Sequence, residues 1–87
     1  MKITEIKEAL LGRRIRHYNA CTGTLDEFTI TTVADVVHAV CFYSPEKNSR
    51  VYVSKDNITT LISEKYFCRT VLEVDGHDYK EEWTLID

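Results

Sequence analysis

The sequence predicts an α+β fold, in which a short N-terminal helix precedes a curved antiparallel sheet or small β-barrel that ends in a C-terminal β-hairpin. Residues 4–11 have the apolar spacing and end signals of a helix. Residues 13–63 contain short runs of β-branched and aromatic residues that are separated by turn signals. Asp75-Gly76 lies between two alternating runs and predicts a hairpin over residues 66–86.

The helix is predicted from its two ends and its apolar face. Thr4 can cap the first turn, and Gly12 can adopt the left-handed conformation that ends a helix. Ile6 and Leu10 are four residues apart, so they fall on one face, which can pack against a sheet. We expect the opposite, charged face to be solvated.

Alternation of side chains predicts the first strand at residues 13–19. Its two faces would carry Arg14, Arg16 and Tyr18 on one side and Ile15 and His17 on the other. The face with two arginines and a tyrosine is a candidate binding surface, although arginines also discourage pairing at a solvated strand edge.

The middle of the chain should continue as a loop and two strands. Residues 20–27 have the small residues and glycine of a loop, and residues 28–33 have strand composition. For residues 34–40 we favour a strand over a helix, because β-branched residues outweigh a valine spacing that fits a helix. A bend near Ala34 and Asp35 would separate this strand from the one before it.

A tight hairpin is predicted next, with its turn at residues 45–48, where Pro45 suits the second turn position. A simple antiparallel register places Phe42 opposite Val51 and Val40 opposite Val53, which gives one apolar face. The reverse face would carry Cys41, Tyr43, Arg50 and Tyr52.

Residues 55–63 follow as a turn and a short strand or helical turn. The order of strand, long loop, "FTITTV", tight hairpin and "DNITTLI" resembles that of Src-homology-type or Tudor-like barrels. The resemblance covers about residues 12–63 and implies a small β-barrel.

The C-terminal hairpin has a predicted register, counted outward from Asp75-Gly76. Trp83 falls on its apolar face, and we interpret it as a core residue. The expected pairs on that face are Val74 with His77, Leu72 with Tyr79, Cys68 with Trp83, and Tyr66 with Leu85. On the reverse face we expect Arg69 with Glu82 and Val71 with Lys80.

Composition indicates one domain over residues 1–87, with 44% hydrophobic residues and no low-complexity tract. The first twelve residues mix charged and apolar side chains, so we expect no signal peptide, no membrane segment and a cytoplasmic location. Three widely spaced cysteines favour reduced thiols over a disulfide framework.

Catalytic and metal-binding patterns are weak. His17 with Cys21, and His38 with Cys41, combine zinc-ligand types, but their spacing does not fit a structural zinc site. The three glycines are isolated, so no phosphate-binding loop is present. We expect no catalytic residues, no metal and no cofactor, and we interpret the protein as a non-enzyme.

Protein binding is the leading functional hypothesis, because Tyr43, Arg50 and Tyr52 combine residue types that are enriched at interfaces. The partner would be another protein or a second copy of this chain, which would form a homodimer. The alternative is weak binding of nucleic acid by the same face together with Arg14, Arg16 and Tyr18. The sequence pI of about 5.6 disfavours it, because six of the last 17 side chains are acidic. A short acidic chain without motifs is typical of accessory or regulatory proteins, including those of viruses and mobile elements.

Overall fold

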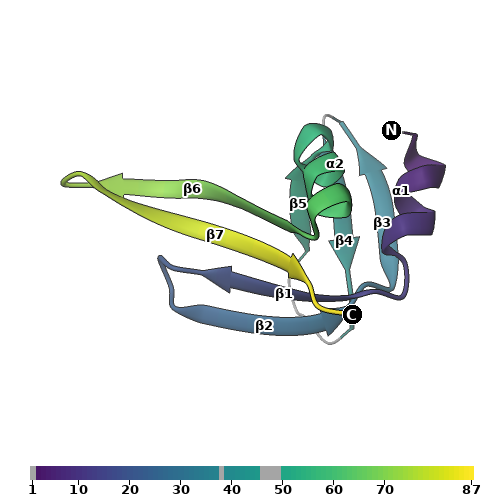
Figure 1. Ribbon diagram of the computed structural model, residues 1–87, viewed down its shortest axis with the longest axis horizontal. Helices are drawn as coiled ribbons and strands as arrows, with labels where there is room; N and C mark the ends of the chain where they lie inside the picture. The colour runs from purple at the N-terminus through teal and green to yellow at the C-terminus, as the bar shows by residue number, and fades with distance from the viewer. Residues whose placement is uncertain (1, 38, 46–49) are drawn as a thin grey trace.

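The computed structural model describes residues 2–37, 39–45 and 50–87, and these form two helices and seven strands (Figure 1). His38 and most of the predicted turn at residues 45–48 therefore lie outside the described residues. The elements in chain order are α1 (Ile3–Leu10), β1 (Arg14–Asn19), β2 (Thr24–Thr29), β3 (Thr32–Val36), β4 (Ala39–Tyr43), β5 (Val51–Ser54), α2 (Lys55–Glu64), β6 (Tyr66–Val74) and β7 (His77–Leu85).

The strands form two antiparallel sheets, a long one with strand order β2-β1-β7-β6 and a short one with order β3-β4-β5. The α+β class is thus confirmed. The two sheets are not closed into a barrel, so the resemblance to Src-homology-type and Tudor-like barrels is not confirmed. The pairs Phe42–Val51 and Val40–Val53 are present as predicted.

The chain passes from the long sheet to the short sheet between Ile30 and Thr31. The Ile30 N–H donates to the Arg13 carbonyl at 2.9 Å, whereas the Thr31 N–H donates to the Tyr43 carbonyl at 3.1 Å. The predicted strand at residues 28–33 is therefore divided here. The bend predicted near Ala34 and Asp35 was wrong, because both residues lie inside β3, where each pairs with β4.

Two other strand boundaries also differ from the prediction. The predicted loop at residues 20–27 is shorter, since β2 begins at Thr24 and pairs with β1. Within the predicted strand at residues 34–40, residues 34–36 and 39–40 are extended rather than helical, but they belong to two strands, because β3 ends at Val36 and β4 begins at Ala39.

Helix α1 differs from expectation at its first residue, and α2 was not predicted as a full helix. Helix α1 begins at Ile3, so Lys2 rather than Thr4 is its N-cap residue, and the Glu5 carboxylate accepts from the Lys2 N–H at 3.3 Å. Gly12 has the expected left-handed conformation, with φ 82°. Residues 55–63, predicted as a turn with a short strand or helical turn, instead belong to the ten-residue helix α2, which the Ser54 hydroxyl caps by accepting from the Asn57 N–H.

The hydrophobic core lies where the helices and the short sheet meet one half of the long sheet. Helix α1 contacts β3, and α2 contacts strands of both sheets. Trp83 is fully buried, as predicted. The other buried apolar residues of this core are Ile6, Leu10, Ile15, Phe28, Ile30, Val33, Val40, Phe42, Val51, Val53, Ile58, Leu61, Phe67 and Leu85.

The β6–β7 hairpin has the predicted turn, with φ 51° at Asp75 and 79° at Gly76. A β-bulge at Val71 then shifts the register by one residue. The pairs Val74–His77 and Leu72–Tyr79 are confirmed, but Phe67 lies opposite Trp83 and Arg69 opposite Glu81. The bulge therefore makes four predicted pairs wrong, namely Cys68–Trp83, Tyr66–Leu85, Arg69–Glu82 and Val71–Lys80.

The outer half of this hairpin, residues 70–80, projects from the body of the molecule and is called the arm below (Figure 1). All of its residues are exposed, and the long axis of the molecule measures 41 Å against 25 and 23 Å for the others. Among the residues described, neither helix is long and apolar enough to cross a membrane.

Candidate functional site

The inner face of the long sheet, which carries Ile15, Trp83 and Leu85, changes in character along the strands. Its base is apolar and covered by the core. The next cross-strand row is polar and contains Thr24, Asn19, Glu81 and Arg69. Beyond this row only the arm continues, with Leu72 paired to Tyr79 and Val74 paired to His77.

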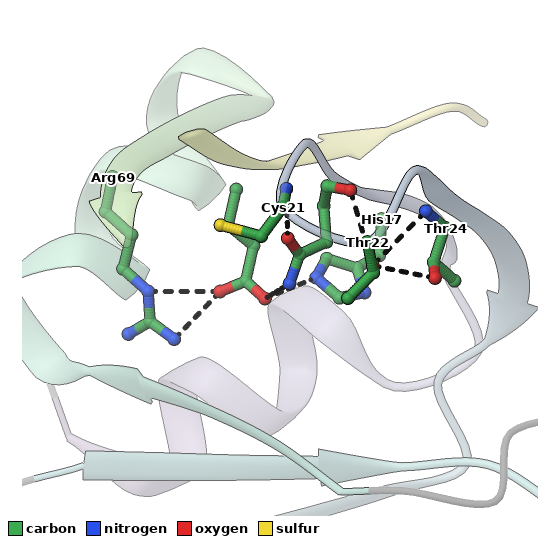
Figure 2. Close-up of polar contacts among 7 residues, drawn as sticks. His17, Cys21, Thr22, Thr24 and Arg69 are labelled. Carbon is green, nitrogen blue, oxygen red and sulfur yellow. Dashed lines mark hydrogen bonds and ion pairs between the residues drawn. The ribbon is translucent and has the colours of Figure 1, made fainter. Parts of the chain in front are cut away.

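Glu81 is the centre of the polar row. Its side chain is only 11% exposed and binds three donors from two strands. His17 Nε2 lies 2.8 Å from Oε2, the Asn19 amide donates to the same oxygen at 3.4 Å, and the Arg69 guanidinium donates twice to Oε1 at 2.9 and 3.1 Å. Figure 2 shows Arg69 and His17 reaching the carboxylate from opposite sides. Strong, charge-assisted hydrogen bonds therefore fix this cluster.

Aromatic rings support the cluster from the core side. The Trp83 ring stacks between His17 and Phe67, with both centroid distances at 5.0 Å, and the Arg69 guanidinium lies 5.0 Å from the Trp83 ring centroid. The Trp83 indole N–H is buried and has no hydrogen-bond acceptor among the residues described.

A cleft of about 340 Å³ lies between this row and the start of β5. Arg50, Val51 and Tyr52 form its second wall, and the Arg50 guanidinium lies 5.1 Å from the Tyr43 ring centroid. The side chains from the long sheet are His17, Asn19, Thr22, Thr24, Asp26, Arg69, Glu81 and Trp83. Two arginines face two carboxylates, so the lining is nearly neutral when His17 is uncharged.

The arm extends the cleft with apolar side chains that nothing in the described chain covers. Leu72, Val74 and Tyr79 are 48%, 44% and 38% exposed on its inner face. On its outer face Glu73 lies directly opposite Asp78, a like-charge pair that destabilises a hairpin. Asp75 at the turn adds a third carboxylate, and no cation of the described residues pairs with any of the three.

Arg14, Arg16 and Tyr18 lie together on the outer face of the long sheet, as predicted. Both arginines already have partners within the sheet. Arg16 Nε is 3.3 Å from a Glu27 carboxylate oxygen, and Arg14 donates to the Thr29 hydroxyl at 3.0 Å. Tyr18 pairs with Leu25, which is 58% exposed.

Tyr66 on β6 donates to Glu82 on the same outer face, and this hydrogen bond raises the pKa of the Tyr66 phenol above its usual range. The outer face of the long sheet is therefore exposed, but several of its polar side chains already bind one another, as Arg16 binds Glu27 and Tyr66 binds Glu82.

The predicted binding residues thus separate into two groups. Arg50 and Tyr52 line the cleft and Tyr43 contacts Arg50, whereas Arg14, Arg16 and Tyr18 occupy the opposite face of the long sheet. The cluster of His17, Arg69 and Glu81 was not predicted from the sequence, because the bulge at Val71 decides which acidic residue meets Arg69.

His17 and Cys21 have separate partners in the described part of the chain. Cys21 is exposed, and its N–H donates to the Asn19 side chain, while His17 faces Glu81. Within residues 2–37, 39–45 and 50–87, no three histidine, cysteine or acidic side chains are placed to hold a metal ion. The pair of His38 with Cys41 lies outside the described residues in part.

Comparisons of the chain with protein-family models, with curated proteins and with solved structures found no match.

Proposed function

We propose that the protein is a non-enzymatic interaction module that binds a protein partner along the inner face of the arm and the mouth of the cleft. The observation that carries this proposal is the exposed apolar row of Leu72, Val74 and Tyr79 on a projecting hairpin. Small domains rarely leave such a row uncovered unless it meets another molecule.

The cleft supports the same proposal. Tyr52 is 50% exposed, and Arg50 has no carboxylate partner among the described residues. Tyrosine and arginine are enriched at binding hot spots, and here they border the apolar face of the arm. The Glu81 cluster holds the opposite wall in place, so a partner would meet a surface that is already ordered.

Binding of nucleic acid remains the alternative, with less support from the geometry. Arg16 is paired with Glu27, and Glu82 lies on the same outer face. The arm carries three carboxylates that have no cation partner among the described residues, and they would repel a phosphate backbone. The proposed setting is the cytoplasm, where the three free cysteines would stay reduced.

The test compares three variants in affinity capture and then in titration with the purified partner. Leu72→Ser combined with Val74→Ser should weaken partner binding about a hundredfold, because it removes the apolar contact. Tyr52→Ala should weaken it about tenfold. Leu25→Ser is the matched control, since it removes a leucine that is 58% exposed, against 48% for Leu72, from the outer face.

Equal loss in the control variant would contradict the proposal. Recovery of nucleic acid that nuclease treatment removes, that rising salt releases, and that Arg14→Ala with Arg16→Ala abolishes would replace it with the alternative.

A further inference from the structure

We propose that the partner that fits this surface is a second copy of the chain. In the inferred two-fold symmetric dimer, the two arms lie antiparallel with their inner faces in contact, and each acidic tip enters the cleft of the other copy. This inference rests on the proposed function, because it names the partner for the same surface.

The register of the β6–β7 hairpin supplies the first argument. Along β7, the Leu72–Tyr79 row is two residues from the Val74–His77 row on one side and two residues from the Arg69–Glu81 row on the other; along β6 the second step spans three residues because of the bulge at Val71. Consider a two-fold axis that runs along the Leu72–Tyr79 row. It places the Val74–His77 row of each copy against the polar row of the other copy. Each step is about 7 Å, so the two offsets match.

Apolar contacts in this arrangement are self-complementary, as an isologous interface requires. Leu72 meets Leu72 of the other copy, and Tyr79 meets Tyr79. These side chains are 48% and 38% exposed in the single chain, so the arrangement covers the largest apolar surface of the arm.

Charges are complementary in the same arrangement. The tip carries Glu73, Asp75 and Asp78 without a cation partner among the described residues, and two of them face each other across the hairpin. The cleft that receives the tip carries Arg50, which likewise has no carboxylate partner in the described chain. Because the tip enters between the polar row and β5, its outer face with Glu73 and Asp78 faces Arg50, and this pairing relieves the repulsion within the tip.

Pairing through the free edge of β6 is a less suitable route to a dimer. The bulge at Val71 interrupts that edge between Thr70 and Leu72, and bulges of this kind prevent one sheet from extending into another. The face of the arm is thus a better surface for a second copy than the β6 edge.

The decisive measurement is sedimentation velocity over a concentration series. We expect the wild-type chain to sediment as a dimer that dissociates on dilution. Leu72→Asp should raise the dimer dissociation constant about a hundredfold, because it places two carboxylates against each other on the axis. Leu25→Asp, on the outer face, should leave the constant unchanged.

A charge exchange tests the contact between tip and cleft. Asp78→Lys and Arg50→Glu should each raise the dissociation constant about tenfold, because each replaces an attraction by a repulsion. The two substitutions in one chain should restore most of the affinity. Absence of this recovery would overturn the inferred docking.

The outcomes separate this inference from the proposed function. A monomer at every concentration, with partner capture still lost in the Leu72→Ser and Val74→Ser variant, would overturn the dimer and leave the module. If the arm variants changed neither sedimentation nor capture, both would be wrong.

Discussion

At the residue scale, Glu81 connects the core to the cleft. Its carboxylate accepts from His17 and Arg69. Both of these side chains also contact the ring of the buried Trp83. A buried carboxylate is stable only when it is well paired, so Glu81 both depends on these donors and fixes their positions.

Glu81→Gln should lower the free energy of unfolding by about 2–4 kcal/mol, since Arg69 and His17 lose their charged acceptor. Urea denaturation monitored by fluorescence of Trp83, the single tryptophan, measures this change. Glu82→Gln is the matched control on the outer face and should cost less than about 1 kcal/mol. Equal effects of the two substitutions would show that the Glu81 cluster is not what stabilises the cleft wall.

Asp87 provides a prediction about pH. The Arg13 guanidinium at 2.7 Å, and the backbone N–H of Arg14, hold the pKa of the Asp87 carboxyl below its usual value. A carboxyl with a lowered pKa stabilises the fold at neutral pH, and this contribution is lost as the pH falls through the folded-state pKa. The difference in unfolding free energy between wild type and Asp87→Asn should therefore be constant at neutral pH.

Below about pH 4 that difference should shrink toward zero. Arg13→Gln should reproduce the same profile, because it removes the other half of the pair. A difference that grows on acidification would contradict this assignment.

At the scale of elements, the bulge in β6 matters most. The extra residue Val71 lets Phe67 face Trp83 in the core while Leu72 and Tyr79 still pair in the arm. If Val71 were instead paired regularly with β7, Phe67 and Leu72 would lie on opposite faces of β6, because side chains alternate with a period of two.

Deletion of Val71 should leave every observed β6–β7 pair in place, since Thr70 and Leu72 would then be adjacent and opposite Lys80 and Tyr79. We expect the variant to fold with an unfolding free energy within about 1 kcal/mol of wild type. Deletion of Val71 and Leu72 together should instead shift the register by one residue on the Thr70 side of the deletion and exchange the two faces of β6 there. NMR contacts between β6 and β7 distinguish the two results.

At the scale of the whole molecule, the core and the arm differ in the contacts that stabilise them. The core joins both helices and both sheets, whereas the arm is held by hairpin pairing alone and has no buried side chain. Such an extension can open without unfolding the body.

Hydrogen exchange should separate the two regions in dilute solution. Backbone amides of residues 72–79 should exchange with opening free energies near zero, while those of Phe67 and Trp83 should approach the global unfolding free energy. In the dimer inferred above, protection of the arm should increase with protein concentration. Arm amides as protected as the core at high dilution would contradict this division.

Much of the fold could be predicted from local sequence. The alternation in residues 13–19, the Asp75-Gly76 turn and the pairing of Phe42 with Val51 all follow from neighbouring residues, and all are present. Helix α2 was missed, although Ser54 could have indicated a cap, because its ten residues are rich in β-branched types that also suit a strand.

The candidate site could be predicted only in part. The sequence by itself determined the α+β class, the hairpins and the meeting of Tyr43 with Arg50, because each depends on side-chain periodicity or short-range pairing. Tertiary structure alone decided the division into two open sheets, the bulge at Val71 and the burial of Glu81 beside His17. The burial of Glu81 depends on a contact with His17, 64 positions away, and the bulge matters because a one-residue change of register exchanges the two faces of a strand.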